Sequence, residues 1–251
     1  MSDKCKVSIN ADDCGLTDSC TEAIALAFQK GLITDTTMVA NGEAFDRAVE
    51  IIRERKLESR VGIHFNLTQY APLTNGITKC ATFVNQGAFH GKINRLKFLT
   101  RQERDAVYEE LSAQICRLEN AGIKVTHADS HHHIHTAIFI APIFARVCKE
   151  HGIQKVRLHR NIGAISRFKR VVKKAYNHWL HRTGFRTFTY FGSMEDVERV
   201  GVKDDLEIMV HPEFDALGNL VDKAGQIDGK AIGKPLALPA GDFQLWGYKE
   251  L

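Results

Sequence analysis

Short apolar segments with strand character alternate with amphipathic helical segments along most of this chain. The segments with strand character lie at 6–10, 36–40, 60–68, 124–129, 155–159, 186–191 and 206–211. Apolar residues at helical spacing between them predict helices from residue 19 onward, over 45–55, from residue 100 onward, over 138–151 and over 165–182. This alternation predicts βαβ units around a parallel sheet. The pattern fits a closed barrel and an open sheet equally well.

Two of the predicted helices begin with the signature of a capping box. Ser19 is followed three residues later by Glu22, and Thr100 by Glu103. Gly122 then marks the end of the second of these helices. The region 70–99 contains Gly, Asn and Thr but no sustained period, which predicts a long loop of the kind that is often functional.

The composition is that of an ordinary globular protein. Of 251 residues, 44% are hydrophobic and 25% are charged, and a chain of this length can form a single α/β domain over 1–251. It contains no apolar run of the ~20 residues that a membrane span needs. The N-terminal MSDKCKVSIN lacks the apolar region of a secretory signal. We therefore expect a cytoplasmic protein with no membrane partner.

Positive charge is concentrated between Glu150 and Glu195. This stretch has ten Lys and Arg residues and no Asp or Glu, although the net charge of the whole chain is only +4. The rest of the chain is therefore net negative. Such asymmetry is typical of a solvated helix face, of a site for an anionic ligand, or of a partner surface, including one for a second copy in a homodimer. Arg157 stands out because it lies in the predicted strand 155–159.

Polar side chains gather where the predicted strands end, which in α/β barrels is where active sites lie. They are Asp12 and Asp13, His64 and Asn66, Asp129 to His135, and His211. Two adjacent carboxylates can divide two roles, one binding a metal and the other accepting a proton, although an aspartate pair is also common in turns and helix caps. A histidine at a strand end can act as a general acid or be structural.

The most specific segment is DSHHHIH at 129–135. Five of its seven residues can ligate or orient a divalent metal ion. In extended geometry Asp129, His131, His133 and His135 would share one face. They cannot all bind one ion, so some must contact the substrate or orient a ligand.

Four separated motifs together resemble the YdjC-type carbohydrate deacetylases, a family that includes chito-oligosaccharide deacetylases. The motifs are NADDCG at 10–15, GIHFNLT at 62–68, THADSHHHIH at 126–135 and MVHPEF at 209–214. The resemblance implies a distorted (β/α) barrel related to polysaccharide deacetylases. It also implies a metal held by Asp13, His64 and His131, with Asp12 as the base. The family usually has Phe where this chain has Cys14, which we interpret as a packing change.

The resulting functional prediction is metal-dependent removal of an acetyl group from an N-acetylated sugar, such as a short chito-oligosaccharide. We expect His211 to protonate the leaving amine. We expect the residues that contact the substrate or orient the metal ligands to be Asn66, Asp129, His133, His135 and Arg157. The cofactor is expected to be one divalent ion, with magnesium and zinc as the main candidates and cobalt or nickel as alternatives, because one carboxylate with two imidazoles suits several metals.

Two other functions remain open on the sequence alone. One is a different metal-dependent sugar enzyme on a barrel, such as an isomerase, an aldolase or a phosphoesterase. The other is nucleic-acid binding through 155–186, although this stretch lacks a binding motif and a run of stacking aromatic residues, so we do not expect nucleic acid as a partner.

Overall fold

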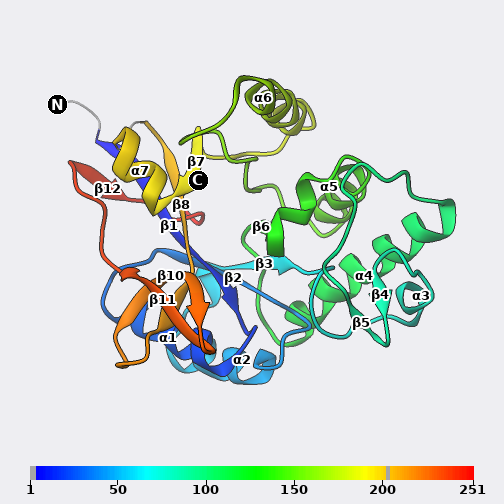
Figure 1. The fold of residues 1–251 in the computed structure, drawn as a ribbon, viewed down its shortest axis with the longest axis horizontal. Coiled ribbons are helices and arrows are strands. Elements are labelled where there is room, and N and C mark those ends of the chain that lie inside the picture. Colours follow the sequence, from blue (N-terminus) through cyan, green and yellow to red (C-terminus); the bar gives the residue numbers. More distant parts are fainter. Residues whose placement is uncertain (1–3, 202–203) are drawn as a thin grey trace.

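A sheet of parallel strands forms the centre of the protein, seen in a computed structural model that describes residues 4–201 and 204–251 (Figure 1). Its strand order is β6-β3-β2-β1-β8-β7, and β12 pairs with the beginning of β1. All of these pairings are parallel. The strands are β1 (Cys5–Cys14), β2 (Asp35–Met38), β3 (Val61–Phe65), β6 (Ala128–Ser130), β7 (Tyr190–Ser193), β8 (Leu206–Val210) and β12 (Phe243–Leu245).

The segment 155–161 joins the two ends of this sheet. It makes a parallel bridge from Val156 to Ala128 of β6, and its Asn161 N–H donates to the carbonyl of Phe191 in β7 at 3.1 Å. The predicted strand at 155–159 is therefore present only as isolated bridges, and the sheet curves into a distorted barrel. The predicted α/β fold with a distorted barrel is confirmed.

Helices cover the outside of the sheet. The longer ones are α1 (Asp18–Gln29), α2 (Phe45–Glu54), α4 (Arg101–Asn120), α5 (Ala141–Glu150), α6 (Arg167–Arg182) and α7 (Met194–Val200). The short ones are η1 (Glu58–Arg60), α3 (Asn75–Thr78) and η2 (His131–Thr136). The central strands β2 and β3 are buried on both faces, as expected for a parallel sheet covered by helices. None of the described helices has the length and apolar content that crossing a membrane requires.

One predicted helix start is confirmed and the other is wrong. Thr100 and Glu103 form the capping box of α4. The first helix instead starts at Asp18, because Thr17 rather than Ser19 caps α1 and completes its capping box with Cys20. The cysteine thiol takes the role that the sequence pattern gave to a glutamate side chain. The region 70–99 is also less irregular than predicted, since it contains α3 and a small hairpin of β4 (Val84–Asn85) and β5 (Ala88–Phe89).

A second, antiparallel sheet follows the barrel strands and was not foreseen from the sequence. It consists of β9 (Pro212–Phe214), β10 (Leu220–Ile227) and β11 (Lys230–Pro235), in the order β11-β10-β9. β9 packs against α1, so this sheet stands beside the carboxyl end of β1 (Figure 1). Most residues of β10 and β11 are exposed or half-exposed, and neither strand has a sustained alternation of apolar and polar residues, so no apolar period marked them in the sequence.

Tyr248 of the C-terminal segment packs into the barrel at the end where the strands begin. The Tyr248 ring stacks on His127 at 3.7 Å between centroids, and its hydroxyl donates to Glu207 at 2.6 Å. The backbone N–H of Tyr248 donates to the Asp35 carboxylate at 3.1 Å. Asp35 also accepts from the hydroxyls of Ser8 and Thr34. These contacts connect β1, β2 and β8 through one buried group.

Burial of Asp35 makes the stability of the protein pH-dependent. Desolvation raises the pKa of Asp35 to about 6, although the hydroxyl of Thr34 and the N–H of Tyr248 partly oppose the shift. A raised folded-state pKa contributes stability that is complete below the unfolded-state pKa and is lost as pH rises through 6. Relative to Asp35→Asn, which cannot titrate, the wild-type free energy of unfolding should fall by about 2 kcal/mol between pH 4 and pH 7. Urea denaturation of both proteins across this range measures the difference, and a constant difference contradicts the prediction.

Candidate active site

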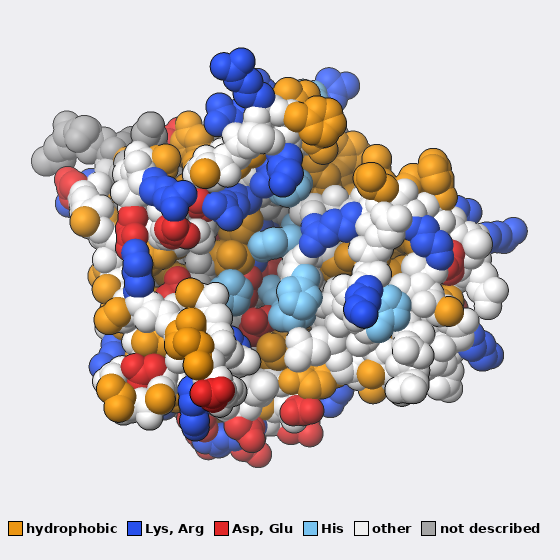
Figure 2. Space-filling view, viewed as in Figure 1, with side chains coloured by type: hydrophobic (Ala, Val, Ile, Leu, Met, Phe, Trp, Pro, Cys, Tyr) orange, Lys and Arg blue, Asp and Glu red, His pale blue; other side chains and the backbone are white. Residues whose placement is uncertain are grey.

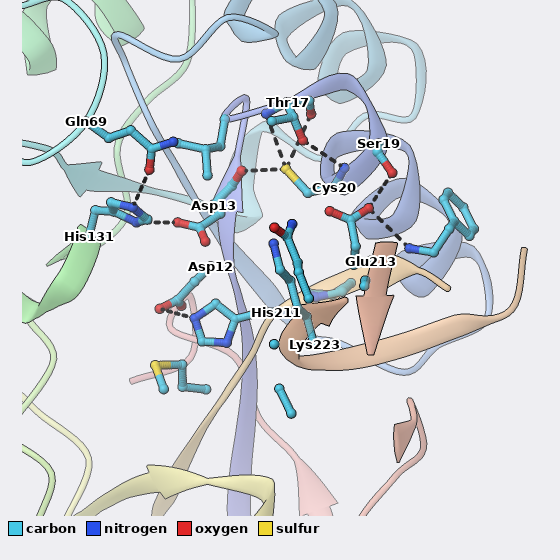
Figure 3. Close-up of a pocket in the computed structure, with 18 of the residues that line it drawn as sticks. Asp12, Asp13, Thr17, Ser19, Cys20, Gln69, His131, His211, Glu213 and Lys223 are labelled. Atoms are coloured by element: carbon cyan, nitrogen blue, oxygen red, sulfur yellow. Dashed lines mark hydrogen bonds and ion pairs between the residues drawn. The ribbon is translucent and has the colours of Figure 1, made fainter. Parts of the chain in front are cut away.

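A cavity of about 910 Å³ opens at the carboxyl ends of the barrel strands. Figure 2 shows it as a hollow in which histidine and acidic side chains gather. One wall is formed by the loop after β1 and by the histidine-rich η2, and the facing wall is formed by β9 to β11 (Figure 3). The cavity therefore lies between the barrel and the antiparallel sheet. The lining residues that sequence analysis singled out are Asp12, Asp13, His64, His131, His133 and His211.

A bulge in β1 separates the two adjacent aspartates. Between Ala11 and Cys14, three steps along β1 match two steps along β2. Asp13 adopts a left-handed backbone conformation with φ of 72°. Such bulges and strained residues often re-aim side chains beside active sites. As a result, Asp12 points into the barrel and Asp13 points toward His131 (Figure 3).

Asp13, His64 and His131 form a cluster that could hold a metal ion, since one ligand atom from each lies within 4.8 Å of the others. Asp13 Oδ1 is 2.7 Å from His131 Nδ1 and 3.2 Å from His64 Nε2. Burial opposes ionisation of Asp13, but hydrogen bonds from the two imidazoles hold its pKa well below the ordinary value. The carboxylate is thus charged and faces two nitrogen donors, a donor set that suits a divalent ion.

A second possible set, Asp12 with His64 and Asp129, is already engaged by other groups. Asp12 and Asp129 both bind the guanidinium of Arg157. Asp129 also accepts from His64 Nδ1 at 2.6 Å, which leaves His64 Nε2 directed at Asp13. A carboxylate that orients a ligating imidazole in this way is common at metal sites. The first cluster is therefore the candidate metal centre.

His64 is held between carboxylates on both sides of its ring. Burial lowers its pKa, but the charges of Asp129, Asp13 and Asp12 together raise it to about 10. Thr37 adds a further contact, because its hydroxyl lies 3.1 Å from both His64 Nδ1 and an Asp129 oxygen. An ion that binds at His64 must consequently displace a proton.

Arg157 is completely buried among three carboxylates. Its Nη1 and Nη2 donate to the two Asp12 oxygens at 2.6 and 2.7 Å, and its Nε donates to Glu207 at 2.7 Å. Its Nη1 also lies 2.5 Å from Asp129. Burial opposes ionisation of Asp12, but Arg157 and the neighbouring His64 hold the pKa of Asp12 well below the ordinary value. Asp12 therefore stays a carboxylate at neutral pH.

The segment 129–135 does not continue as an extended strand, so the prediction that four of its side chains share one face is wrong. After β6 the chain turns into η2, where His132 and His133 both have φ of 52°. His131 and His133 line the cavity, and so does the intervening His132. His135 is instead buried behind them, with its Nδ1 2.5 Å from Ser130 Oγ.

His133 and His135 are neutral histidines with free ring atoms. Within the described residues, His133 Nδ1 and His135 Nε2 are buried without a hydrogen-bond partner. Burial, assisted by the charge of Arg157, lowers the pKa of His133 to about 3. Burial also holds the pKa of His135 well below the ordinary value. His133 can therefore offer an uncharged nitrogen to a ligand in the cavity.

His211 stands on the wall formed by the antiparallel sheet. Its Nε2 lies 4.0 Å from Asp12 Oδ2, across from the metal cluster (Figure 3). β10 fixes its backbone, since His211 N–H donates to Asp222 at 2.8 Å and its carbonyl accepts from Lys223 N–H at 2.9 Å. The side chain is about one third exposed, so it can reach a bound ligand.

Asn66 does not line the cavity, but its side chain makes hydrogen bonds that fix the loops after β2 and β3. Its side-chain amide donates to Asn41 Oδ1 and to the Gln69 carbonyl, and its Oδ1 accepts from the N–H of Thr68 at 2.9 Å. Gln69 in turn places its side-chain oxygen 3.2 Å from His131 Nε2. Asn66 therefore acts through the loop that follows β3.

Several groups of the site were missed by sequence reasoning. Glu207 carries a charge inside the otherwise apolar strand LEIMV, and that contrast could have identified it. Burial raises its pKa to about 7 although Arg157 opposes the shift. Thr37 and Gln69 carried no recognisable signal, because hydroxyl and amide residues are frequent at strand ends and in loops. Glu213 and Lys223 belong to the unforeseen sheet and face the cavity (Figure 3).

The basic stretch 155–186 separates into buried and exposed parts. Arg157 belongs to the interior of the barrel, and Arg160 forms an ion pair with the buried Asp196. Most of the other cations lie on α6, whose exposed side also carries Phe168 and Val171. Cys14, beside the candidate metal centre, is buried in the hydrophobic core. Burial raises the pKa of its thiol, so it remains an uncharged packing residue, as interpreted from the sequence.

The buried arginine gives a stability prediction. Arg157→Leu leaves Asp12, Asp129 and Glu207 without their cation, and breaking a buried ion pair costs about 3–5 kcal/mol. Without the guanidinium the pKa values of these carboxylates rise above their unfolded values, so the loss should be smaller at pH 5 than at pH 7. Arg160→Leu, which removes a half-exposed arginine, should cost less and is the matched control. Urea unfolding measures both variants, and equal losses contradict the prediction.

The chain is similar to known proteins over most of its length. The family model described as YdjC-like protein matches residues 6–232. A protein of Listeria monocytogenes serotype 4a (strain HCC23) named carbohydrate deacetylase is 28% identical over 210 residues, which cover 83% of this chain and 82% of that one. A protein of the same name from Vibrio parahaemolyticus is 34% identical over 148 residues, or 59% of this chain and 57% of that one.

A solved structure shows the same fold. It is a crystal structure from Enterococcus faecalis V583, provisionally described as a cellobiose-phosphate cleavage protein. It superposes with a TM-score of 0.66 at 24% identity and covers 85% of this chain and 82% of that one. With the family match over most of its length, and with the motif residues gathered around one cavity, this chain belongs to the YdjC-like protein family.

Proposed function

We propose that this protein is a metal-dependent hydrolase that removes an acetyl group from an N-acetylated sugar. One observation carries the proposal: Asp13, His64 and His131 converge at the cavity directly beside Asp12, a carboxylate that Arg157 keeps ionised. Amide hydrolysis needs both an electrophilic centre and a proton acceptor within reach of one water. The relatives named carbohydrate deacetylase support the same chemistry and class of substrate.

The residues present fit one divalent ion. Asp13, His64 and His131 would hold it, and Asp129 would orient His64 through Nδ1. When bound, such an ion supplies a Lewis acid for the acetyl carbonyl and lowers the pKa of a water. Two imidazoles with one carboxylate favour zinc, cobalt or nickel over magnesium, a harder ion that usually prefers oxygen ligands. Magnesium and zinc remain the two metals to compare.

Asp12 and His211 would handle the protons. Asp12 takes the proton of the attacking water, and Arg157 holds its carboxylate in place by donating to both of its oxygens. Because its pKa is low, Asp12 binds that proton weakly. His211 Nε2, 4.0 Å away, can receive it and donate it to the leaving sugar amine. His133 offers its neutral ring to the substrate from the opposite wall.

The proposed substrate is a short chito-oligosaccharide, such as the disaccharide diacetylchitobiose. The cavity of about 910 Å³ falls within the roughly 300–1,000 Å³ typical of small-molecule sites. The sheet of β9 to β11 stands over one side of it, which suits a short ligand better than a continuous polymer. A single domain over 1–251, a cytoplasmic location and a possible homodimer stay predictions from the sequence.

Acetate release tests the proposed reaction. The protein should release acetate from N-acetylglucosamine oligomers, offered with and without a 6-phosphate, and removal of the metal by a chelator should abolish the release until metal is returned. The disaccharide should react faster than insoluble chitin. A fully metal-loaded protein that releases no acetate from any of these sugars would favour another barrel reaction, such as isomerisation, aldol cleavage or phosphoester hydrolysis.

The two adjacent aspartates should fail in different ways. Asp13→Asn removes the charged member of a three-residue cluster, so this variant should purify with little metal and recover partly when metal is added. Asp12→Asn leaves the cluster intact but deletes the proton acceptor. Its activity should fall about 10²–10⁴-fold, and added metal should not restore it.

Metal content measured on both purified variants separates these roles. If Asp12→Asn lost the metal while Asp13→Asn kept it, the two assignments would have to be exchanged. Asp222→Asn, which alters a neighbouring carboxylate that contacts only the backbone of His211, controls for a general loss of charge around the cavity. Its metal content should equal that of the wild type.

A further inference from the structure

Two neighbouring helices bring three metal-binding side chains together away from the catalytic cavity. α4 and α5 lie side by side on the outside of the barrel (Figure 1). Cys116 and Glu119 are one turn apart near the end of α4, so they share a face. His151 caps the end of α5. None of the three belongs to the cavity or to the network around Arg157.

The spacing of these groups is close to that of a coordination shell. The thiol of Cys116, a carboxylate oxygen of Glu119 and a ring nitrogen of His151 all lie within 4.8 Å of one another. His151 Nδ1 is 3.5 Å from Glu119 Oε2. Tetrahedral zinc with bonds of about 2.0–2.3 Å holds its ligand atoms roughly 3.3–3.8 Å apart. Side-chain rotation alone can supply the small adjustment that remains.

The backbone beneath these side chains is already fixed. Tyr108 of α4 donates its hydroxyl to Glu150 of α5 at 2.8 Å, and Arg146 stacks over the Tyr108 ring at 4.3 Å. The backbone N–H of His151 donates to Val147 at 3.1 Å, which completes the last turn of α5. An ion therefore meets ligands whose helices are held in place, and little ordering entropy opposes its binding.

The chemistry of the donors selects the ion. Sulfur, imidazole and carboxylate together form a ligand set typical of zinc, whereas magnesium avoids sulfur. Cys116 and Glu119 are exposed, so the ion has an open path and a water can take the fourth position. The catalytic cluster contains no sulfur, so only the cluster on α4 and α5 can give a sulfur-to-metal signal.

We propose that Cys116, Glu119 and His151 form a zinc site that clamps the end of α4 to the end of α5. These helices support the catalytic cavity from outside. Gln114 of α4 hydrogen-bonds to the backbone of Asn66, and α5 follows directly on η2. Zinc at the clamp would stiffen both supports without touching the substrate.

Cobalt spectroscopy tests the site independently of the deacetylase activity. Cobalt added to metal-free protein should produce a sulfur-to-cobalt charge-transfer band in the near ultraviolet, with a molar amplitude equivalent to one thiolate ligand. Cys116→Ser should lose the band, whereas Cys5→Ser, which changes a thiol outside both clusters, should keep it. Asp13→Asn should also keep it, because the catalytic cluster holds no sulfur. Absence of the band from the wild type, or its survival in Cys116→Ser, overturns the proposal.

Zinc content gives a second, independent measurement. The zinc-loaded wild type should contain two ions per chain, and Cys116→Ser and His151→Ala should each contain one while still releasing acetate. Equal zinc content in the wild type and in both variants would contradict the proposed zinc site of Cys116, Glu119 and His151. If Asp13→Asn kept both ions, the catalytic assignment would fail instead, so the two proposals are tested separately.

Discussion

The interior of this barrel depends on one buried cation. Arg157 is inaccessible to solvent, and it receives carboxylates from three strands: Asp12 of β1, Asp129 of β6 and Glu207 of β8. A buried charge is tolerated only while its partners stay in place. A slip of one residue in any of these strands would turn the carboxylate away and leave charges unpaired, so the ion cluster fixes the register that the apolar residues alone leave loosely defined.

The same cluster couples the framework to the chemistry. Asp129 binds Arg157 with one oxygen and His64 with the other. The hydroxyl of Thr37 contacts both Asp129 and His64, and His64 belongs to the candidate metal centre. Arg157 binds both oxygens of Asp12 and Asn10 donates to one of them, while Asp12 also lines the cavity. The ion pairs of Arg157 therefore determine both the orientation of His64 as a metal ligand and the charge of Asp12 as the proposed base. A packing change in the interior that moves Arg157 will alter both properties.

Much of this arrangement could be predicted from the sequence. Apolar strands located the sheet, and the four motifs located Asp12, Asp13, His64 and His131 around one cavity. The bulge that parts the two aspartates and the left-handed turn at His132 and His133 could not be predicted, because they arise from tertiary contacts rather than from local preference. The sheet of β9 to β11 was not predicted because β10 and β11 are largely exposed and lack a sustained alternation of apolar and polar residues.

Tyr248 has a consequence for the order in which the molecule is completed. It stacks on His127, bonds to Glu207 and Asp35, and follows every strand of the sheet in the chain. Chains emerge from the ribosome N-terminus first. During synthesis the strands that carry the three carboxylates therefore leave the ribosome before Tyr248, so the contacts of Tyr248 with Glu207 and Asp35 form only after those strands are available.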